Sequence, residues 1–350
     1  MDIVFLPDNG DNPYQKILKD RLAPLAAKVV PGPGTAFLPV VGSLIKYRPD
    51  IVHLHWTNPY LLGRNLPVSL IKSLFFIFQL ACCRIWGVKI VWTIHNIYNH
   101  EKYQYRLEMF FNRITARLAD ALITHSAAHK RNVRDLYGLK DDSKIFVINQ
   151  GNYVSLYENL VSREEARARL GVGKDGKVFL FFGNIRRYKG VFELVEAFKR
   201  TEGADVRLLI AGRPYDEEIK GDLEDVVKGD ARIKIFLQFV PDREVQVYMN
   251  ACDAVVLPYL EITTSAVLLL ALSFGKPVIA PSLGYIKEIL DPEGGIIYDS
   301  GDQEGLLLSL RKALRSDLTA MGRHNLAGAA KYTWDDAARK TYAVYSSLLK

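Results

Sequence analysis

The feature that most constrains the fold of this chain is an alternation of short apolar runs with longer helical patterns, which occurs twice. Repeated strand–helix–strand units form parallel sheets with helices on both faces. The sequence therefore predicts an α/β chain with two doubly wound parallel sheets. The expected strands are 3–6, 51–55, 89–94 and 121–125 in the first half, and 178–182, 207–211, 233–236, 254–257, 277–279 and 295–298 in the second.

The chain length agrees with two domains. The chain has 350 residues, and a domain typically takes roughly 150. The join is expected in the polar stretch 149–158, which gives an N-terminal domain of residues 1–155 and a C-terminal domain of residues 156–332. Parallel sheets bind ligands beyond the carboxyl ends of their strands. We therefore expect a ligand-binding cleft between the two domains.

Charge and cysteine content limit the partners and the compartment. The net charge of +7 allows a nucleic acid, an acidic membrane surface or a phosphorylated ligand. No nucleic-acid recognition motif is present, so we expect no such partner. The three cysteines lack metal-ligand spacing and, with no signal peptide before the first expected strand, predict a cytoplasmic protein. The most apolar stretch, 73–83, is shorter than the roughly 20 residues of a spanning helix, so we expect no membrane crossing.

The sharpest local signal is a basic, glycine-containing loop at 181–190, with the sequence FFGNIRRYKG. It lies between an expected strand and an expected helix. Gly183 lets the backbone approach a ligand, and a helix N-terminus offers unpaired N–H groups to an anion. Arg186 adds a bidentate cation and Lys189 a point charge, which together suit a diphosphate. The alternative is a basic, solvated turn.

A second loop, rich in hydroxyl groups, precedes another expected helix at 265–274. Thr263, Thr264 and Ser265 follow the expected strand 254–257. Their hydroxyl groups can cap the helix and can also bond a phosphate or a sugar hydroxyl. Capping alone is the alternative.

Five segments together resemble the GT-B glycosyltransferases, close to glycosyltransferase family four. The resemblance implies two Rossmann-like domains with a cleft between them and a final helix, within 333–350, that crosses back to complete the N-terminal domain. It also implies nucleotide-sugar binding by the C-terminal domain, to which Glu288 would contribute. The matching segments are Gly183…Arg186…Lys189-Gly190, Ala211-Gly212, Ser265…Gly275-Lys276-Pro277-Val278-Ile279, Gly284…Glu288-Ile289, and Tyr332-Thr333-Trp334 with the helix that follows.

The chain departs from that family in the donor loop. Retaining members usually carry two glutamates seven residues apart, whereas Leu270 occupies the second position and Ile262 the first, with Glu261 one residue away. Asn184 stands where the usual phosphate-loop arginine would be. The Thr-Ser loop is similar to the branch of bacterial polysaccharide glycosyltransferases that form β-linkages. This resemblance implies an inverting enzyme, with a retaining enzyme that uses Glu261 as the alternative.

The first domain supplies the expected catalytic residues. The run Thr93-Ile94-His95-Asn96, which ends with His100-Glu101, follows the expected strand 89–94 and resembles the same branch. An inverting transfer needs a general base opposite the leaving diphosphate. Glu101 is the first choice for this base and His100 the second, and His95 would contact the donor's phosphate or sugar. A satisfied strand-end histidine and a helix-capping pair are the structural alternatives.

Acceptor binding is expected at the ends of the first two strands. Asp8 and Asn12 lie in the first loop and are rival base or acceptor residues, and His55 and Trp56 follow the strand 51–55. His53 and His55 are expected to point to opposite faces of the strand, so that only one of them would face a ligand, and no metal site is expected. Metal ions and other cofactors are not expected elsewhere either, because no Asp-x-Asp motif follows a strand.

Residues 51–100 contain no Asp or Glu but contain basic residues such as Lys72 and Arg84. Apolar residues recur there at helical spacing. Such a helix can lie on an anionic membrane or hold a lipid-linked acceptor, and a core helix is the alternative. The recurring residues are Leu70, Leu74, Phe75, Phe78 and Cys82.

The resemblance and the residues together predict a glycosyltransferase that moves a sugar from a UDP- or GDP-sugar to a membrane-carried, lipid-diphosphate-linked saccharide in polysaccharide biosynthesis. We expect a metal-independent hexosyltransferase that is cytoplasmic and contacts the membrane peripherally. A non-catalytic sugar-nucleotide-binding subunit is an alternative from another class.

Overall fold

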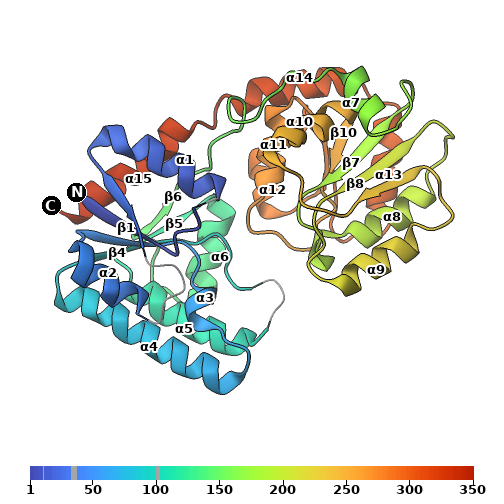
Figure 1. Ribbon diagram of the computed structural model, residues 1–350. Coiled ribbons are helices and arrows are strands. Elements are labelled where there is room, and N and C mark those ends of the chain that lie inside the picture. Colours follow the sequence, from blue (N-terminus) through green and yellow to red (C-terminus); the bar gives the residue numbers. More distant parts are fainter. Residues whose placement is uncertain (11, 33–37, 100–102) are drawn as a thin grey trace. The chain divides into compact units, whose positions relative to one another are not determined.

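The structure is a computed structural model that describes residues 1–10, 12–32, 38–99 and 103–350 (Figure 1). The chain forms two compact units. Unit 1 comprises Met1–Gly151 with Tyr332–Lys350, and unit 2 comprises Asn152–Lys331. The first change of unit, after Gly151, falls within the stretch 149–158 in which the sequence places the join.

Unit 1 contains a six-stranded parallel sheet in the order β2-β1-β3-β4-β5-β6. Four of the six strands were predicted. β2 and β6 were missed because they are short edge strands with half-exposed residues. The strands are β1 Asp2–Leu6, β2 Lys28–Pro31, β3 Ile51–Leu54, β4 Lys89–Thr93, β5 Ala121–Thr124 and β6 Ile145–Val147.

Helices cover both faces of this sheet, because successive side chains along each strand point to opposite faces. Ile3 and Phe5 pack against α1 and α15, whereas Val4 and Leu6 pack in the core formed with α2, α4, α5 and α6. The final helix α15 therefore belongs to unit 1. The helices are α1 Pro13–Leu22, η1 Ala23–Leu25, α2 Pro39–Tyr47, α3 Asn58–Leu61, α4 Leu66–Ile85, α5 Tyr105–Leu118, α6 Ala127–Tyr137 and α15 Trp334–Leu348.

Unit 2 contains a second six-stranded parallel sheet, in the order β12-β11-β10-β7-β8-β9. All six of its strands were predicted. The strands are β7 Val178–Phe182, β8 Arg207–Ala211, β9 Ile233–Phe236, β10 Ala254–Val256, β11 Val278–Pro281 and β12 Gly295–Tyr298. The helices of this unit are α7 Arg163–Arg169, η2 Arg187–Lys189, α8 Val191–Lys199, α9 Glu217–Val226, α10 Asp242–Ala251, α11 Ala266–Ser273, α12 Gly284–Ile289, α13 Gly305–Leu314 and α14 Leu318–Ala329.

The strand orders fix where each unit presents a ligand site. In unit 1 the chain winds from β1 outward to β2 and then from β3 in the other direction, so the order reverses between β1 and β3. In unit 2 it reverses between β7 and β10. Ligands of open parallel sheets bind beyond the carboxyl ends of the strands at such reversals. The predicted acceptor residues follow β1 and β3, and the two predicted donor loops follow β7 and β10.

Helix α4 corrects the expectation drawn from its apolar stretch. It has 20 residues and, by length and composition, is long enough to cross a membrane. One face nevertheless belongs to unit 1, because Phe76 and Leu80 pack in its core and the Gln79 side chain accepts hydrogen bonds from two backbone N–H groups at the start of α2. The opposite face is exposed at Leu70, Leu74 and Phe78. The core alternative is therefore confirmed for one face, and the membrane contact stays a prediction for the exposed one.

Candidate active site

The basic loop of unit 2 begins where β7 ends and is shaped by two glycines. Gly183 has a φ of +97° and Gly190 a φ of +70°. A Cβ atom on Gly190 would lie 1.9 Å from the carbonyl oxygen of Pro258, so no other residue fits there. This contact joins the loop after β7 to the loop after β10 across the strand-order reversal. The two predicted donor loops therefore lie next to each other at one sheet edge.

Lys189 is one of the two cations of this loop that the sequence predicts to bind a diphosphate. Its ammonium lies 3.9 Å from the position that a Cβ atom of Gly183 would take. The residue is half-buried, and its ammonium forms no hydrogen bond or ion pair with any residue that the structure describes. Burial, and then the neighbouring Arg186 charge, lower the pKa of Lys189 to about 8. A half-buried cation without a partner is a ready site for an anion.

Arg186 is oriented by an aromatic residue that the sequence analysis missed. Its guanidinium carbon lies 4.3 Å from the centroid of the Tyr215 ring, and the Tyr215 N–H donates to the Ile185 carbonyl at 3.0 Å. Stacking of this kind fixes the plane of a guanidinium. The available signal was an aromatic residue shortly after the strand end at Ala211.

The neighbouring Arg187 points elsewhere. Its guanidinium is exposed and forms ion pairs with Glu218 and Asp222 of α9. The charge of Arg187 is therefore compensated by carboxylates, whereas Lys189 has no such partner among the described residues. This difference provides a matched control for the role of Lys189.

The hydroxyl-rich loop divides into a capping residue and two others. Ser265 is buried and is the N-cap of α11, because its hydroxyl accepts from the Leu268 N–H at 3.1 Å. The same hydroxyl lies 3.1 Å from the Tyr259 hydroxyl. The predicted cap is confirmed. Thr263 and Thr264 are half-buried, and their hydroxyls form no hydrogen bond with the described part of the chain.

Three further residues of unit 2 entered the prediction of the donor site, namely Glu288, Leu270 and Glu261. Glu288 is exposed on α12, the helix that follows β11. Leu270 is buried in α11, and Glu261 is half-buried in the loop after β10. The carboxylate of Glu261 thus lies in the same loop as Thr263 and Thr264.

Unit 1 brings together histidines from three neighbouring strand ends. The Nδ1 atom of His55 lies 3.3 Å from Nε2 of His95, and Nδ1 of His95 lies 3.4 Å from Nε2 of His125. Nδ1 of His125 lies 2.8 Å from the Ile148 carbonyl oxygen. These atoms form one hydrogen-bonded chain across the ends of β3, β4 and β5.

The carbonyl at one end of this chain fixes the proton positions along it. A carbonyl only accepts, so Nδ1 of His125 is protonated and its Nε2 accepts. His95 must then donate from Nδ1, and His55 must donate from Nδ1 to the Nε2 of His95. Both nitrogens of His95 are therefore bonded within the chain. The Nε2 of His55 becomes an acceptor, and it is buried without a partner among the described residues.

Burial keeps these histidines neutral. It lowers the pKa of His53 to about 3, that of His125 to about 4 and that of His129 to about 3. For His55 and His95 burial is again the largest cause, followed by the neighbouring histidines, and both pKa values lie well below the usual value. A neutral His95 contributes dipoles and hydrogen bonds rather than a positive charge at this sheet edge.

The expectation that His53 and His55 face different sides is wrong. Residues two apart in a strand share a face, and the two rings have centroids 4.4 Å apart. His53 bonds the Tyr345 hydroxyl at 2.5 Å and the Thr93 hydroxyl at 2.7 Å. It therefore ties α15 to the sheet, while His55 enters the histidine chain.

The predicted acceptor residues lie at the β1–β3 reversal and are partly engaged. The Asp8 carboxylate accepts from Lys19 at 3.0 Å, and Asn12 is the N-cap of α1. Trp56 is half-buried and stacks on His95, with ring centroids 4.4 Å apart and planes 17° apart. This stack forms an aromatic surface at the strand ends.

His100 and Glu101 lie outside the described residues, and their catalytic roles stay predictions. The segment that leads to them is anchored by a residue that the sequence analysis did not select. Glu108 of α5 is buried and accepts from the Asn99 N–H at 2.9 and 3.0 Å, and burial raises its pKa to about 7. Tyr137 donates to the Ile97 carbonyl at 2.7 Å. These hydrogen bonds hold the backbone at Ile97 and Asn99, where the chain leaves the sheet edge.

The described residues do not include a group of three or more His, Cys, Asp or Glu side chains that could hold a metal ion. In the histidine chain, the Nε2 atom of His55 is the one ring nitrogen without a hydrogen-bond partner among the described residues. Two cations of the described residues, Lys189 and Arg186, lie at the unit 2 reversal.

Two family models together match most of the chain. Residues 3–152 match the model described as Glycosyltransferase Family 4, and residues 162–332 match the model described as Glycosyl transferases group 1. The chain belongs to the family-four-like glycosyltransferases of the GT-B fold. The predicted family and the predicted α/β fold with two doubly wound sheets are confirmed.

Proteins similar to this chain include several bacterial enzymes. The GDP-mannose:glycolipid 4-beta-D-mannosyltransferase of Xanthomonas campestris pv. campestris is 27% identical over 346 residues, which cover 98% of this chain and 90% of the relative. The sucrose-phosphate synthase of Thermosynechococcus elongatus shares the fold with a TM-score of 0.80 at 16% identity, covering 100% of this chain and 99% of that one. HepE of Anabaena, in complex with UDP and glucose, gives a TM-score of 0.78 at 17% identity, covering 99% and 100%.

Proposed function

We propose that this glycosyltransferase moves a hexosyl group from a UDP- or GDP-sugar to a lipid-diphosphate-linked saccharide in polysaccharide biosynthesis. The Xanthomonas relative, whose name includes a GDP-mannose donor, a glycolipid acceptor and a β-linkage, supports this assignment because it aligns with 98% of the chain. The Anabaena structures, which hold UDP with glucose and UDP-glucose, agree with a nucleotide-sugar donor. We propose inversion at the anomeric carbon, which gives a β-linkage.

The observation that carries the donor assignment is the unpaired ammonium of Lys189 beside Arg186 at the β7–β10 reversal. In the proposed reaction an acceptor hydroxyl oxygen attacks the anomeric carbon, and the bond from that carbon to the diphosphate oxygen breaks. The hydroxyl proton passes to a base, for which Glu101 remains the first choice. Lys189 and Arg186 then stabilise the charge that develops on the leaving diphosphate, without a metal ion.

Nucleotide binding tests this assignment directly. Calorimetric titration with UDP, GDP and the corresponding monophosphates should give the tightest binding for one of the diphosphates. Lys189→Met and Arg186→Ala should each weaken that binding roughly ten- to a hundredfold, because a charged hydrogen bond contributes about 1.5–3 kcal/mol. Arg187→Ala is the matched control, because its charge is already compensated by α9.

Two outcomes would contradict the donor assignment. One is equal affinity for mono- and diphosphates. The other is an equal loss of affinity in Arg187→Ala and Lys189→Met, which would indicate a nonspecific charge effect.

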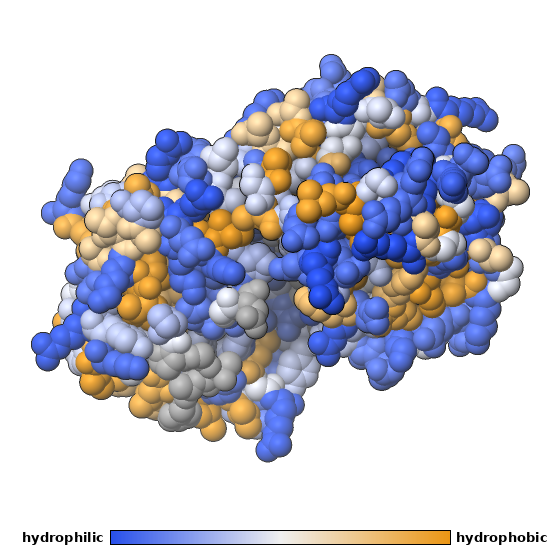
Figure 2. Space-filling view, turned by 45° about the horizontal axis from the view of Figure 1, so that its top comes forward, coloured by the Kyte–Doolittle hydropathy of each residue, from blue (hydrophilic) through white to orange (hydrophobic). Residues whose placement is uncertain are grey.

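We propose that the exposed face of α4 holds unit 1 at a membrane on the cytoplasmic side, where the acceptor is carried. Leu74 and Phe78, four residues apart, are 57% and 60% exposed, and apolar atoms lie along the lower edge of this unit in Figure 2. Lys72 does not contribute to lipid binding, because its ammonium donates to the carbonyls of Pro59 and Leu62 at 2.7 Å each. Arg84, which is exposed, remains available.

Sedimentation with anionic vesicles tests the membrane contact. The double variant Leu74→Ser/Phe78→Ser should lose vesicle binding and keep the melting temperature, because neither side chain packs in the core. Leu308→Ser, an exposed leucine of unit 2, is the control and should bind as the parent does. Unchanged vesicle binding in the double variant would remove α4 from the proposal.

Product analysis distinguishes the inverting from the retaining reaction. A β-linked product is expected. An α-linked product would contradict inversion and assign the central role to Glu261.

A further inference from the structure

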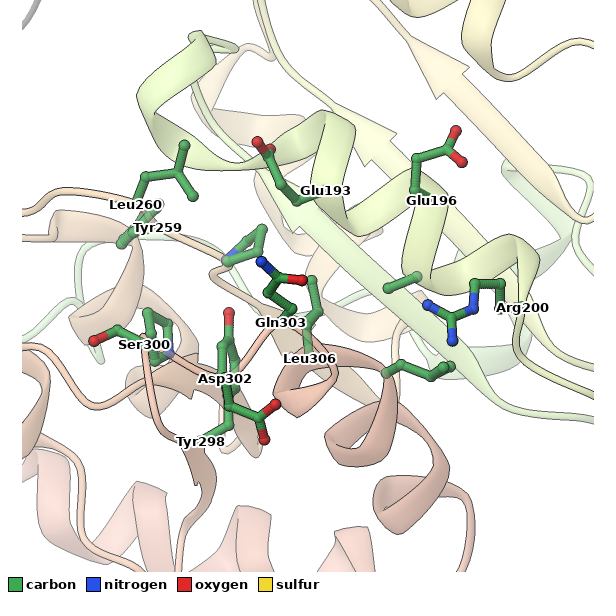
Figure 3. A pocket seen from close by; sticks show the side chains of 15 residues that line it. Glu193, Glu196, Arg200, Tyr259, Leu260, Tyr298, Ser300, Asp302, Gln303 and Leu306 are labelled. Atoms are coloured by element: carbon green, nitrogen blue, oxygen red, sulfur yellow. The ribbon is translucent and has the colours of Figure 1, made fainter.

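Unit 2 contains a cavity that none of the predicted donor-binding residues lines. It has a volume of about 430 Å³ and lies between α8 and α13, beyond the ends of β10, β11 and β12 (Figure 3). None of Gly183, Arg186, Lys189 and Thr263–Ser265 lines it. Its size is within the range of roughly 300–1,000 Å³ that is usual for small-molecule sites.

The floor of this cavity is apolar. Ala197 of α8 and Leu306 and Leu307 of α13 provide aliphatic surface, and Pro258 and Pro281 close the end nearest the strands. Such a floor suits the apolar body of an organic ligand. It offers nothing to a hydrated metal ion, which requires oxygen ligands on several sides.

The rim is acidic. Glu193 and Glu196 project from α8, and Asp302 lies across the cavity from them (Figure 3). The one lining cation in the described residues is Arg200, and its two terminal nitrogens donate to the Glu304 carboxylate at 2.8 and 2.6 Å. Its charge is therefore compensated. Glu196 is also paired, with Lys199 at 3.5 Å, which leaves Glu193 and Asp302 as the rim carboxylates without an ion pair among the described residues. Their negative charge disfavours a phosphate at this rim.

Two of the polar groups at the rim are unengaged. The Glu193 carboxylate and the Tyr298 hydroxyl form no hydrogen bond or ion pair with the described part of the chain. Burial, and then the charge of Glu193, raise the pKa of Tyr298, so its hydroxyl stays protonated. The Glu193 carboxylate and the Tyr298 hydroxyl are therefore close enough to interact electrostatically. A hydrogen-bond donor that carries positive charge would satisfy the carboxylate.

We propose that this cavity binds an organic cation, with its ammonium group at Glu193 and Tyr298 and its apolar body on Leu306 and Leu307. The shape accepts a small aromatic or aliphatic body, and the charge selects the ammonium over neutral and anionic groups. Pro258–Leu260, at the start of the loop after β10, form one wall of the cavity, and the Leu260 N–H donates to the Tyr188 carbonyl at 2.9 Å. Because none of the predicted donor-binding residues lines the cavity, we expect no competition between its ligand and a nucleotide.

Three probes that share one ring test the proposal. Benzylamine, benzyl alcohol and benzoate differ in charge and little in size, and each is titrated against the full chain by calorimetry and ligand-observed NMR. Benzylamine should bind more tightly than benzyl alcohol, by up to about fivefold, since a partly exposed ion pair is worth up to about 1 kcal/mol. Benzoate should bind most weakly. Saturating UDP or GDP should leave the benzylamine affinity unchanged.

Variants locate the site and separate charge from shape. Glu193→Gln should bring the benzylamine and benzyl alcohol affinities together, because it removes the charge at an exposed position. Ser300→Trp should block all three probes by filling the exposed mouth. Glu217→Gln, in the first turn of α9 and outside the cavity, is the control and should change neither affinity.

Four results would overturn the proposal. They are equal binding of benzylamine and benzyl alcohol, a preference for benzylamine that survives Glu193→Gln, displacement of benzylamine by UDP or GDP, and displacement by a neutral methyl pyranoside, which would assign the cavity to saccharides. The probes report binding without turnover, so this outcome is independent of the proposed transferase reaction.

Discussion

The lowered pKa of Lys189 makes donor binding depend on pH in a direction that can be calculated. With a pKa of about 8, the free ammonium is about nine-tenths protonated at pH 7 and about one-quarter protonated at pH 8.5. A bound diphosphate restores the charged form. Binding above pH 8 therefore requires proton uptake, and the affinity for a nucleoside diphosphate should fall about fourfold, or about 0.8 kcal/mol, between pH 7 and 8.5.

Lys189→Arg removes this dependence without removing the charge, because a guanidinium stays protonated throughout this range. Calorimetry at pH 7.0, 7.5, 8.0 and 8.5 should give a falling affinity for the parent chain and a constant one for Lys189→Arg. Repeating the pH 8.5 titration in two buffers of different ionisation enthalpy should show proton uptake in the parent alone. A parent affinity that does not change with pH, or an equal fall in both proteins, would refute the assignment of the anion site to Lys189.

Three further predictions concern unit 1. His53, His125 and His129 are neutral when folded and titrate near their usual pKa when unfolded, so acid should lower the free energy of unfolding by at least about 3 kcal/mol per pH unit between pH 6 and 5. Urea titrations followed by tryptophan emission report the unfolding of unit 1 alone, since all four tryptophans lie in it. An equal urea midpoint at pH 5 and pH 7 would disprove this prediction. The side-chain ¹⁵N spectrum should show His55, His95 and His125 protonated at Nδ1, and an Nε2-protonated His95 would break the proposed chain. Glu101→Gln should lower turnover by roughly a hundredfold or more at nearly unchanged donor affinity, and normal turnover together with a loss in Asp8→Asn would move the base to the first loop.

The strands of unit 2 could be predicted because each is a short apolar run bounded by turn residues. The strands that were missed, β2 and β6, lie at sheet edges, where half-exposed residues weaken the apolar pattern. Helix α4 was recognised, but its apolar stretch was judged too short. Interruptions by Ser69, Ser73 and Gln79 hide its length, and these polar side chains are buried in contacts with the rest of the unit.

The donor loops could be found from sequence because their chemistry is local. Gly183, Arg186 and Lys189 lie within seven residues of one another, so the motif and the site coincide. The histidine chain is different, since its members come from three strand ends and its proton order is set by the Ile148 carbonyl. Only the sheet order brings these atoms together, and no spacing in the sequence encodes it.

The orienting aromatic residues were missed for a related reason. Tyr215 and Tyr259 each touch a selected residue, Arg186 and Ser265 respectively. Their own sequence signal is only that an aromatic residue follows a strand closely. That pattern is typical of many core positions, so tertiary contacts were needed to give it meaning.

Turnover of a nucleotide sugar by the purified chain tests the central claim most directly. The chain would be incubated with labelled UDP- or GDP-sugars and with vesicles that contain lipid-diphosphate-linked saccharides, and both released nucleoside diphosphate and labelled glycolipid would be counted. The account predicts equal amounts of the two products for one donor, with turnover reduced in Lys189→Met and preserved in Arg187→Ala. Tight nucleotide binding with no transfer to any lipid-linked saccharide would contradict it and would identify a sugar-nucleotide-binding subunit instead.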